Sequence, residues 1–142
     1  MKIRILLVDD EKDFVESLAE RLRLRDYEVI TVLSGIEALK LVKEQEFDII
    51  FLDVKMPGMD GIETLKQIKG LKPLPQVIML TGHATVETAI EGMKEGAYDY
   101  LMKPVVTENL IDLISRAYKI VEEQRERIRR AEVDNILKKR GW

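Results

Sequence analysis

Short apolar segments alternate with amphipathic segments along most of the chain. Five of the apolar segments predict strands: Ile3–Val8, Tyr27–Val32, Ile49–Leu52, Val77–Leu80 and Tyr98–Met102. Two of them, Ile49–Leu52 and Val77–Leu80, are apolar at every position, so both faces of these strands must be covered. This is typical of central strands in a parallel sheet with helices above and below it.

Each predicted strand is followed by a segment with helical periodicity. The first helix has an apolar face made by Phe14, Val15, Leu18 and Leu22. The second helix is predicted to start at Ser34 as its N-cap, with Glu37 three residues later completing a capping box. Its inner face is expected to carry Ile36, Leu39 and Val42.

The later helices are punctuated by glycine and proline. The third helix is predicted over Ile62–Ile68, and Lys69–Pro75 is predicted to be a loop because it contains one glycine and two prolines. A fourth helix is expected over 84–95. It contains Gly92, which costs about 1 kcal/mol relative to alanine, so this helix is expected to be marginally stable. A fifth helical pattern begins at Thr107 and continues nearly to the end of the chain.

The repeated strand–helix order predicts an α/β fold: a doubly wound parallel sheet with right-handed crossovers and helices on both faces. A length of 142 residues suits one domain with its own core. The absence of cysteine excludes disulfides and thiol chemistry and favours a cytoplasmic location. No apolar run is long enough for a membrane span, and a net charge of −3 does not favour nucleic acid as a partner.

The strongest chemical signal lies where the predicted strands end. The residues there are Asp9, Asp10, Asp53, Thr81 and Lys103. Parallel strands bring their carboxyl ends to one edge of the sheet, which is where α/β proteins bind ligands. Three carboxylates in one cleft repel each other, and Lys103 together with Mg²⁺ would balance them. An aspartate in such a site can attack phosphorus and form an acyl phosphate.

Each of these residues also has an ordinary structural explanation. The acidic pair could stabilise the N-terminus of the first helix, Thr81 could cap a strand end, and Lys103 could be a solvated charge. Such explanations would have to coincide at four strand ends at once. The chemical interpretation is therefore preferred.

Four motifs in this order resemble the receiver domain of bacterial two-component response regulators. They are Leu7-Val8-Asp9-Asp10, Leu52–Gly61, Leu80-Thr81-Gly82-His83 and Gly96–Pro104. The resemblance covers about residues 3–118. It implies the flavodoxin-like (βα)5 fold with strand order 2-1-3-4-5, here with an extended C-terminal helix.

The resemblance also implies how the acidic residues act. Asp53 matches the phosphoacceptor, Asp10 a direct Mg²⁺ ligand, and Asp9 an acid that holds the metal through water. The main-chain carbonyl of Lys55 would complete the protein ligands.

The remaining matched residues belong to the response to phosphorylation. Thr81 matches the switch hydroxyl, Lys103 the lysine that pairs with the phosphoryl group, and Tyr100 the aromatic ring that swings inward, although Tyr100 could also be an ordinary core residue. The peptide bond before Pro104 is expected to be cis. Lys55 and His83 occupy flanking positions that tune the lifetime of the phosphoryl group in this family, although an exposed bystander is the alternative for His83.

The function that the resemblance implies is signalling rather than conventional enzymology. A sensor histidine kinase or a histidine phosphotransfer protein would phosphorylate the chain, and the face formed by 84–95, 98–102 and the start of the last helix would control a downstream effector protein. The protein would catalyse only its own phosphorylation and dephosphorylation. The alternatives are a phosphorelay intermediate and a phosphorylation-independent dimerisation or docking module.

Two enzymatic or ligand-binding alternatives are less well supported by the residues. A phosphohydrolase of the haloacid dehalogenase type would need a second acid where this chain has Lys55. A nucleotide-binding protein would need a glycine-rich loop, which the sequence lacks.

We divide the chain into a receiver, 1–120, and a helical extension of the last helix, 121–142, where Gly141 is expected to end the helix. A heptad register with Ile114, Val121, Ile128 and Asn135 suggests a short coiled coil and a homodimer, and a solvated single helix is the alternative. DNA binding is not expected, because acids interrupt the basic run in the extension. We expect a stand-alone receiver, although residues 80–104 also resemble receivers that precede ATPase-type transcription activators in longer chains.

Overall fold

One parallel sheet organises the fold, as the order of strands and helices predicts. The computed structural model describes residues 2–82 and 86–141. Within these residues the sheet has five strands in the order β2-β1-β3-β4-β5, which confirms the expected flavodoxin-like arrangement. The strands are β1 (Arg4–Val8), β2 (Glu28–Val32), β3 (Ile49–Asp53), β4 (Gln76–Thr81) and β5 (Asp99–Met102).

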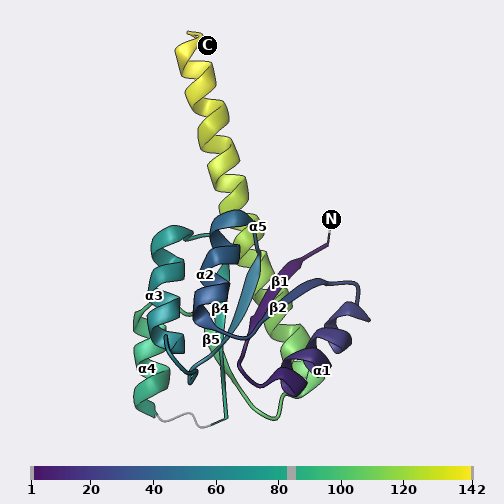
Figure 1. The fold of residues 1–142 in the computed structure, drawn as a ribbon. Helices are drawn as coiled ribbons and strands as arrows, with labels where there is room; N and C mark the ends of the chain where they lie inside the picture. Colours follow the sequence, from purple (N-terminus) through teal and green to yellow (C-terminus); the bar gives the residue numbers. More distant parts are fainter. Residues whose placement is uncertain (1, 83–85, 142) are drawn as a thin grey trace.

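Helices cover both faces of this sheet (Figure 1). They are α1 (Lys12–Arg23), α2 (Gly35–Glu44), α3 (Gly61–Leu71), α4 (Val86–Lys94) and α5 (Thr107–Lys139). Helices α1 and α5 pack on one face, and α2 and α3 pack on the other, as the two clusters of buried side chains show. Helix α4 lies on the same face as α3, because Gly92 approaches Ile62.

Alternating residues of the central strands supply the two halves of the core. On β1, Ile5 and Leu7 pack under α1 and α5, whereas Leu6 and Val8 pack under α2 and α3. All five residues of β3 are buried. The uniform hydrophobicity of these strands therefore reflects burial on both faces of the sheet.

The N-terminal part of α2 departs from the sequence prediction at one residue. Ser34 is the N-cap, and its hydroxyl accepts a hydrogen bond from the Glu37 amide at 3.2 Å, as predicted. Ile36, however, is 66% exposed. The buried face is set by Ala38, Leu39 and Val42, and at 100° per residue Ile36 lies well to the side of it.

The third helix is longer than the glycine at position 70 suggested. Helix α3 continues to Leu71, so the first residues of the predicted loop 69–75 are helical. Lys72 adopts an extended conformation before Pro73, as residues that precede proline prefer. Proline therefore ends this helix, and the single glycine only weakens it.

Helix α4 is held by few buried contacts. Gly92 is the one buried residue among those described in α4, whereas Val86, Ile90 and Met93 are exposed. The first two residues of the predicted fourth helix lie outside the described residues. A helix with so little buried apolar surface is easily displaced.

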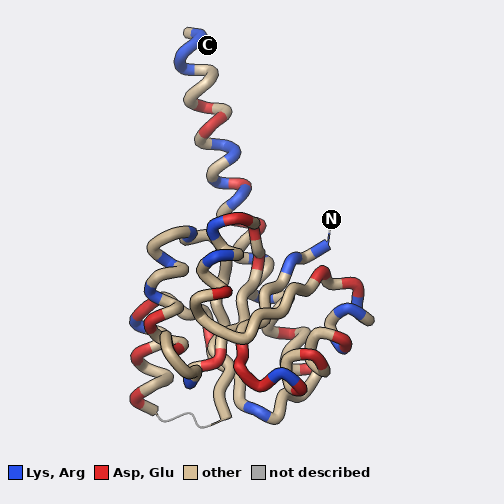
Figure 2. Tube along the Cα trace, viewed as in Figure 1, with Lys and Arg blue, Asp and Glu red and all other residues tan. Residues whose placement is uncertain are grey.

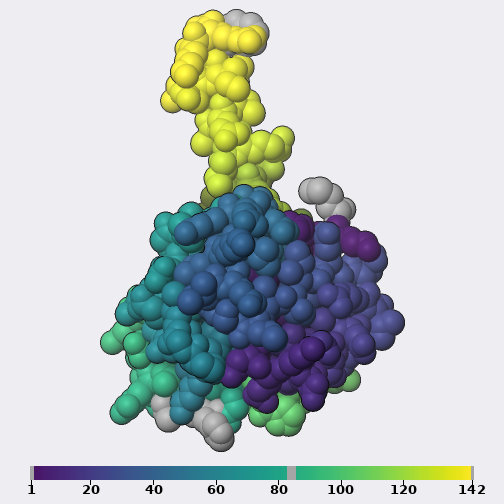
Figure 3. All heavy atoms as spheres, in the orientation of Figure 1, coloured from purple at the N-terminus to yellow at the C-terminus, as the bar shows by residue number. Residues whose placement is uncertain are grey.

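Helix α5 begins as a core helix and continues as a free one. Its buried residues are Leu110, Leu113, Ile114, Ala117 and Val121. From residue 122 to 141 no residue is buried, and this part stands out from the body of the molecule (Figures 1 and 3). Gly141 has φ +73° just after the helix ends, as expected. In the part of the chain that the structure describes, no helix is long and apolar enough to cross a membrane.

Candidate functional site

The register of the sheet brings three of the predicted residues to one edge. Val8 of β1 is paired with Leu52 of β3, so the residues that follow, Asp9 and Asp53, are neighbours. Thr81 ends the adjacent strand β4. Figure 2 shows acidic residues gathered where β1 leads into α1, at this same edge.

Asp9, Asp10 and Asp53 form a carboxylate cluster. One oxygen from each lies within 4.8 Å of the others. Asp9 is fully buried and Asp53 nearly so, whereas Asp10 is exposed. The cluster is therefore open to solvent and to ligands on the Asp10 side.

Lys103 supplies the positive charge at this cluster. Its Nζ lies 2.6 Å from Asp9 Oδ2 and 4.0 Å from Asp53 Oδ2. The peptide bond between Lys103 and Pro104 is cis, as predicted. Burial alone would lower the Lys103 pKa, but the contacts with Asp9 and Glu11 and the negative charges of Asp53 and Asp9 together raise it.

The surroundings of Asp53 disfavour its ionised form. Its pKa is raised from 3.8 to about 7, first by burial and then by repulsion from Asp9 and, less strongly, Asp10. Lys103 and a hydrogen bond from the Lys55 main-chain amide act in the opposite direction without cancelling this effect. A cation placed among these carboxylates would favour the ionised form instead.

The turn after β3 brings backbone unusually close to Asp53. A Cβ atom on Gly61 would lie 2.0 Å from the Asp53 carbonyl oxygen and 2.7 Å from Val54 Cα. Only glycine allows this approach. Asp60 caps α3 by accepting a hydrogen bond from the Glu63 amide at 2.9 Å, so α3 begins directly after the close approach.

Thr81 and Tyr100 line one narrow cavity beneath α4, together with Met79, Ala89 and Met93. Thr81 is buried, whereas the Tyr100 side chain is 43% exposed. Thr81 also lines the cleft that contains Asp10, Asp53 and Lys103. A shift of the Thr81 side chain would therefore change the space that the Tyr100 ring can occupy.

The carboxylate edge is also a cleft of about 260 Å³. It is lined by Asp10, Glu11, Asp53, Lys55, Thr81, Gly82 and Lys103. Oxygen ligands of this kind, with room for water, are what Mg²⁺ prefers. The residues present therefore fit a hydrated Mg²⁺ ion.

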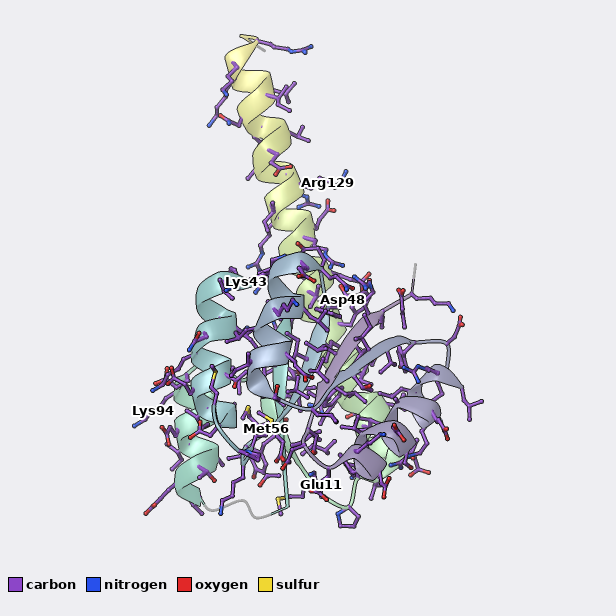
Figure 4. The ribbon with its side chains drawn as sticks, viewed as in Figure 1. Glu11, Lys43, Asp48, Met56, Lys94 and Arg129 are labelled. Atoms are coloured by element: carbon purple, nitrogen blue, oxygen red, sulfur yellow. The ribbon has the colours of Figure 1, made fainter. Side chains whose placement is uncertain are left out.

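Two residues at this site were not predicted from the sequence. Glu11 Oε1 lies 2.9 Å from Lys103 Nζ, and Figure 4 labels Glu11 at this end of the molecule. The Phe14 ring lies under the same ammonium, 4.3 Å from ring centre to Nζ. The position of Glu11 directly after the acidic pair is the only sequence signal for its contribution.

One residue that the sequence analysis singled out, His83, lies outside the described residues.

The fold and the carboxylate cluster together define a class of α/β protein, in which an acidic site lies at the carboxyl end of a parallel sheet. Residues 5–115 match the response regulator receiver domain family. The chain belongs to this family, which is a family of signalling domains.

Similarity to individual proteins agrees with the family match. The chain is 45% identical over 115 residues to the transcriptional regulatory protein ZraR of Escherichia coli, covering 81% of this chain and 26% of that protein. It is 37% identical over 128 residues to a putative NtrX-like response regulator of Rickettsia bellii, covering 89% of this chain and 27% of that protein. The chain thus spans about a quarter of the length of these curated relatives.

A solved receiver domain protein (CheY-like) from Methanospirillum hungatei has the same fold. It superposes with a TM-score of 0.84 at 31% identity, covering 87% of this chain and 99% of that one. The receiver part of the chain is therefore matched in both sequence and structure.

Proposed function

We propose that the protein is a phosphorylation-activated receiver in which Asp53 accepts a phosphoryl group from a phosphohistidine. The observation that carries this proposal is the convergence of three carboxylates within 4.8 Å of one another beside Lys103. Burial and, after it, repulsion from Asp9 destabilise the ionised carboxylate of Asp53. Binding of a cation would relieve this repulsion and would also balance the negative charge that the phosphoryl group adds.

In the proposed reaction an Asp53 carboxylate oxygen attacks phosphorus in line with the histidine nitrogen. A P–O bond forms and the P–N bond breaks, and the imidazole leaves after taking up a proton. Lys103 would pair with one phosphoryl oxygen and the Thr81 hydroxyl with another. Hydrolysis by water later returns the carboxylate and releases phosphate, so the chain would catalyse only its own phosphorylation and dephosphorylation.

The residues proposed to hold Mg²⁺ are Asp10 and Asp53 directly, Asp9 through water, and Lys55 through its main-chain carbonyl. When bound, the ion would neutralise negative charge on the carboxylates and on the phosphoryl oxygens. Asp9 is already held in place, because its Oδ1 accepts the Glu11 amide at 2.9 Å.

The proposed switch runs from Thr81 to Tyr100. Movement of the Thr81 hydroxyl toward the phosphoryl group would change the cavity beneath α4, and the exposed Tyr100 ring could then turn inward. The weak packing of α4 supports its role as the element that shifts between two positions.

The proposed output surface is the face formed by α4, β5 and the start of α5. Large apolar side chains are exposed there, namely Val86, Ile90, Met93, Tyr100, Met102 and Val106. Contiguous exposed apolar residues favour a protein partner. We propose a sensor histidine kinase or a histidine phosphotransfer protein as phosphodonor and an effector protein as the partner of this face.

Phosphorylation is tested by incubating the protein with Mg²⁺ and acetyl phosphate and recording the intact mass. We expect one added phosphoryl group in the parent protein and none in Asp53→Asn. Chelation of Mg²⁺ should prevent the addition. Equal labelling of the Asp53→Asn variant would contradict the proposal.

We also propose that the chain divides functionally at residue 120, and that the extension 121–142 associates with a second copy. The supporting observation is the exposure of Ile128, Val133 and Ile136 on the part of α5 that stands out from the body of the molecule (Figure 1). Light scattering should show a dimer in the parent and a monomer in Ile128→Glu/Ile136→Glu. Leu24→Glu, at an exposed leucine outside the extension, serves as control.

A further inference from the structure

We propose that Glu11 is a positioning residue that competes with the phosphoryl group for Lys103, an inference that rests on the function proposed above. Lys103 Nζ lies 2.9 Å from Glu11 Oε1 but 4.0 Å from Asp53 Oδ2. In the unphosphorylated protein the ammonium is therefore held on the α1 side of the cleft. The ammonium therefore lies next to the place that a phosphoryl group on Asp53 would occupy, but it is too far from Asp53 Oδ2 for a hydrogen bond.

The contacts of the ammonium make this position well defined. The ammonium forms an ion pair with Asp9 Oδ2 at 2.6 Å and donates a hydrogen bond to Glu11 Oε1 at 2.9 Å, and its nitrogen lies 4.3 Å from the centre of the Phe14 ring. Together they leave the Lys103 side chain only 13% exposed. Asp9, Glu11 and Phe14 all lie on β1–α1, so one segment of chain forms the whole holding position.

Glu11 is oriented for this contact by its own backbone. It is the N-cap residue of α1, yet its side chain makes no capping hydrogen bond. Its amide is instead held by Asp9 Oδ1 at 2.9 Å. The side chain is thereby free to reach across to Lys103 and is not used to cap the helix.

A phosphoryl group on Asp53 attracts the ammonium away from the α1 side of the cleft, since Asp53 Oδ2 now lies 4.0 Å from Nζ, and this movement lengthens the contacts of Lys103 with Asp9 and Glu11. Asp9 is fully buried, whereas the Glu11 side chain is 65% exposed. Water can replace lysine at an exposed carboxylate at little cost, but not at a buried one. The contact to Glu11 is therefore the one that Lys103 gives up.

The consequence is that Glu11 opposes the phosphorylated state. Removing its charge while keeping its shape, in Glu11→Gln, should free Lys103 for the phosphoryl group. An exposed ion pair contributes modestly, so we expect beryllofluoride, in the presence of Mg²⁺, to bind about two- to fivefold more tightly. Spontaneous loss of the phosphoryl group should slow by a similar factor.

The matched control is Asp13→Asn. Asp13 is an exposed acid in the first turn of the same helix, and no ion pair joins it to Lys103 among the described residues. Its loss changes the net charge by the same amount without touching the ammonium. Equal tightening in both variants would mean that only the general charge matters and would overturn the inference.

A second experiment tests whether Glu11 changes beryllofluoride binding by acting on Lys103. In a Lys103→Gln background, Glu11→Gln should change beryllofluoride binding by less than 1.5-fold, roughly the error of such measurements. Persistence of the full effect without the lysine would also overturn the inference.

A third experiment uses NMR spectroscopy and starts from the metal-free protein. The Phe14 ring current should shift the Lys103 ε-methylene proton signals upfield in the metal-free protein. Glu11→Gln should reduce this shift and Asp13→Asn should leave it unchanged, and Mg²⁺ with beryllofluoride should reduce it in the parent. If the parent fails to bind beryllofluoride, the proposed function fails. If the parent binds it and Glu11→Gln behaves like Asp13→Asn, only the inference about Glu11 fails.

Discussion

A buried aspartate stands at each end of β3, and the two are surrounded in opposite ways. Asp48, just before the strand, accepts a hydrogen bond from the Arg4 amide at 2.7 Å and pairs with the Arg125 guanidinium at 2.5 Å. Asp53, the last residue of the strand, has its nearest cation 4.0 Å away and two other carboxylates close by. Figure 4 labels Asp48 near the base of the α5 extension, at the end of the molecule opposite Glu11.

The difference shows how position in a parallel sheet separates structural from chemical roles. At the amino end, one carboxylate has one cation and one amide, so its charge is satisfied and it ties β3 to β1 and α5. At the carboxyl end, the carboxylates outnumber the cations, so the charge is incompletely balanced. The first arrangement stabilises the fold, and the second leaves an aspartate whose ionised form is stabilised by binding a cation.

We predict the largest effect at the satisfied end. Asp48→Ala should lower the free energy of unfolding by about 3 kcal/mol, because it leaves the Arg4 amide without its acceptor and breaks the ion pair with Arg125. Urea denaturation measures this change. The control is Asp134→Ala, at an exposed acid in the extension, which should change the free energy of unfolding by less than about 0.5 kcal/mol. Similar changes in the two variants would contradict a structural role for Asp48.

At the other end of the strand, the loss of an aspartate should have the opposite sign. In metal-free protein above pH 7, Asp53→Asn should raise the free energy of unfolding by about 2 kcal/mol, because the ionised carboxylate is disfavoured by burial and by Asp9. Denaturation in the presence of a chelator checks the sign. A destabilised Asp53→Asn protein would contradict the proposed contrast between the two ends.

The pH dependence of this effect follows from the raised pKa of Asp53. A folded pKa of about 7, above the ordinary 3.8, means that the Asp53 contribution is fully present below pH 4. It is lost as the pH rises through about 7. The gain in stability of Asp53→Asn over the parent should therefore be near zero at pH 4 and largest near pH 8, and Mg²⁺ should diminish it.

A smaller effect is expected at the partner of Asp48. Arg125→Gln should lower the free energy of unfolding by about 1 kcal/mol. This is less than for Asp48→Ala, because Asp48 keeps its hydrogen bond from the Arg4 amide and the lost partner in the ion pair is a half-exposed arginine. Protease cleavage within residues 122–141 should also become faster, since the Arg125–Asp48 pair holds the start of the extension against the receiver. Unchanged cleavage would mean that the ion pair does not hold the extension.

The smallest effect is expected in α4, away from both aspartates. Gly92→Ala should stabilise the protein by roughly 0.5–1 kcal/mol through helix propensity. The added Cβ would meet Met79 and Ile62 at 3.5 and 3.6 Å, which are ordinary contacts. A stiffer α4 should reduce the change in Tyr100 fluorescence on adding beryllofluoride. An unaltered Tyr100 response in a measurably stabilised variant would show that α4 mobility does not limit the switch.

Much of the fold could be predicted from the sequence because its signals are local. Apolar strands, helical periodicity and the Ser34 cap are properties of neighbouring residues, and together they predict the β-α order of the chain. The strand order came from the resemblance to receiver domains, and the structure has that order. The side chains that end the strands were predictable for the same reason. Once the sheet is parallel, Asp9, Asp10 and Asp53 must meet at one edge.

Only the tertiary structure decided which long-range partners each charged group has. Nothing local relates Glu11 to Lys103, or Asp48 to Arg125, because these pairs are separated by 92 and 77 residues. The exposure of Ile36 likewise depends on how α2 is rotated against the sheet. Sequence determined which chemical groups stand at each end of β3. Burial and distance, which exist only in the folded chain, decided that one aspartate is neutralised and the other is left with a pKa of about 7.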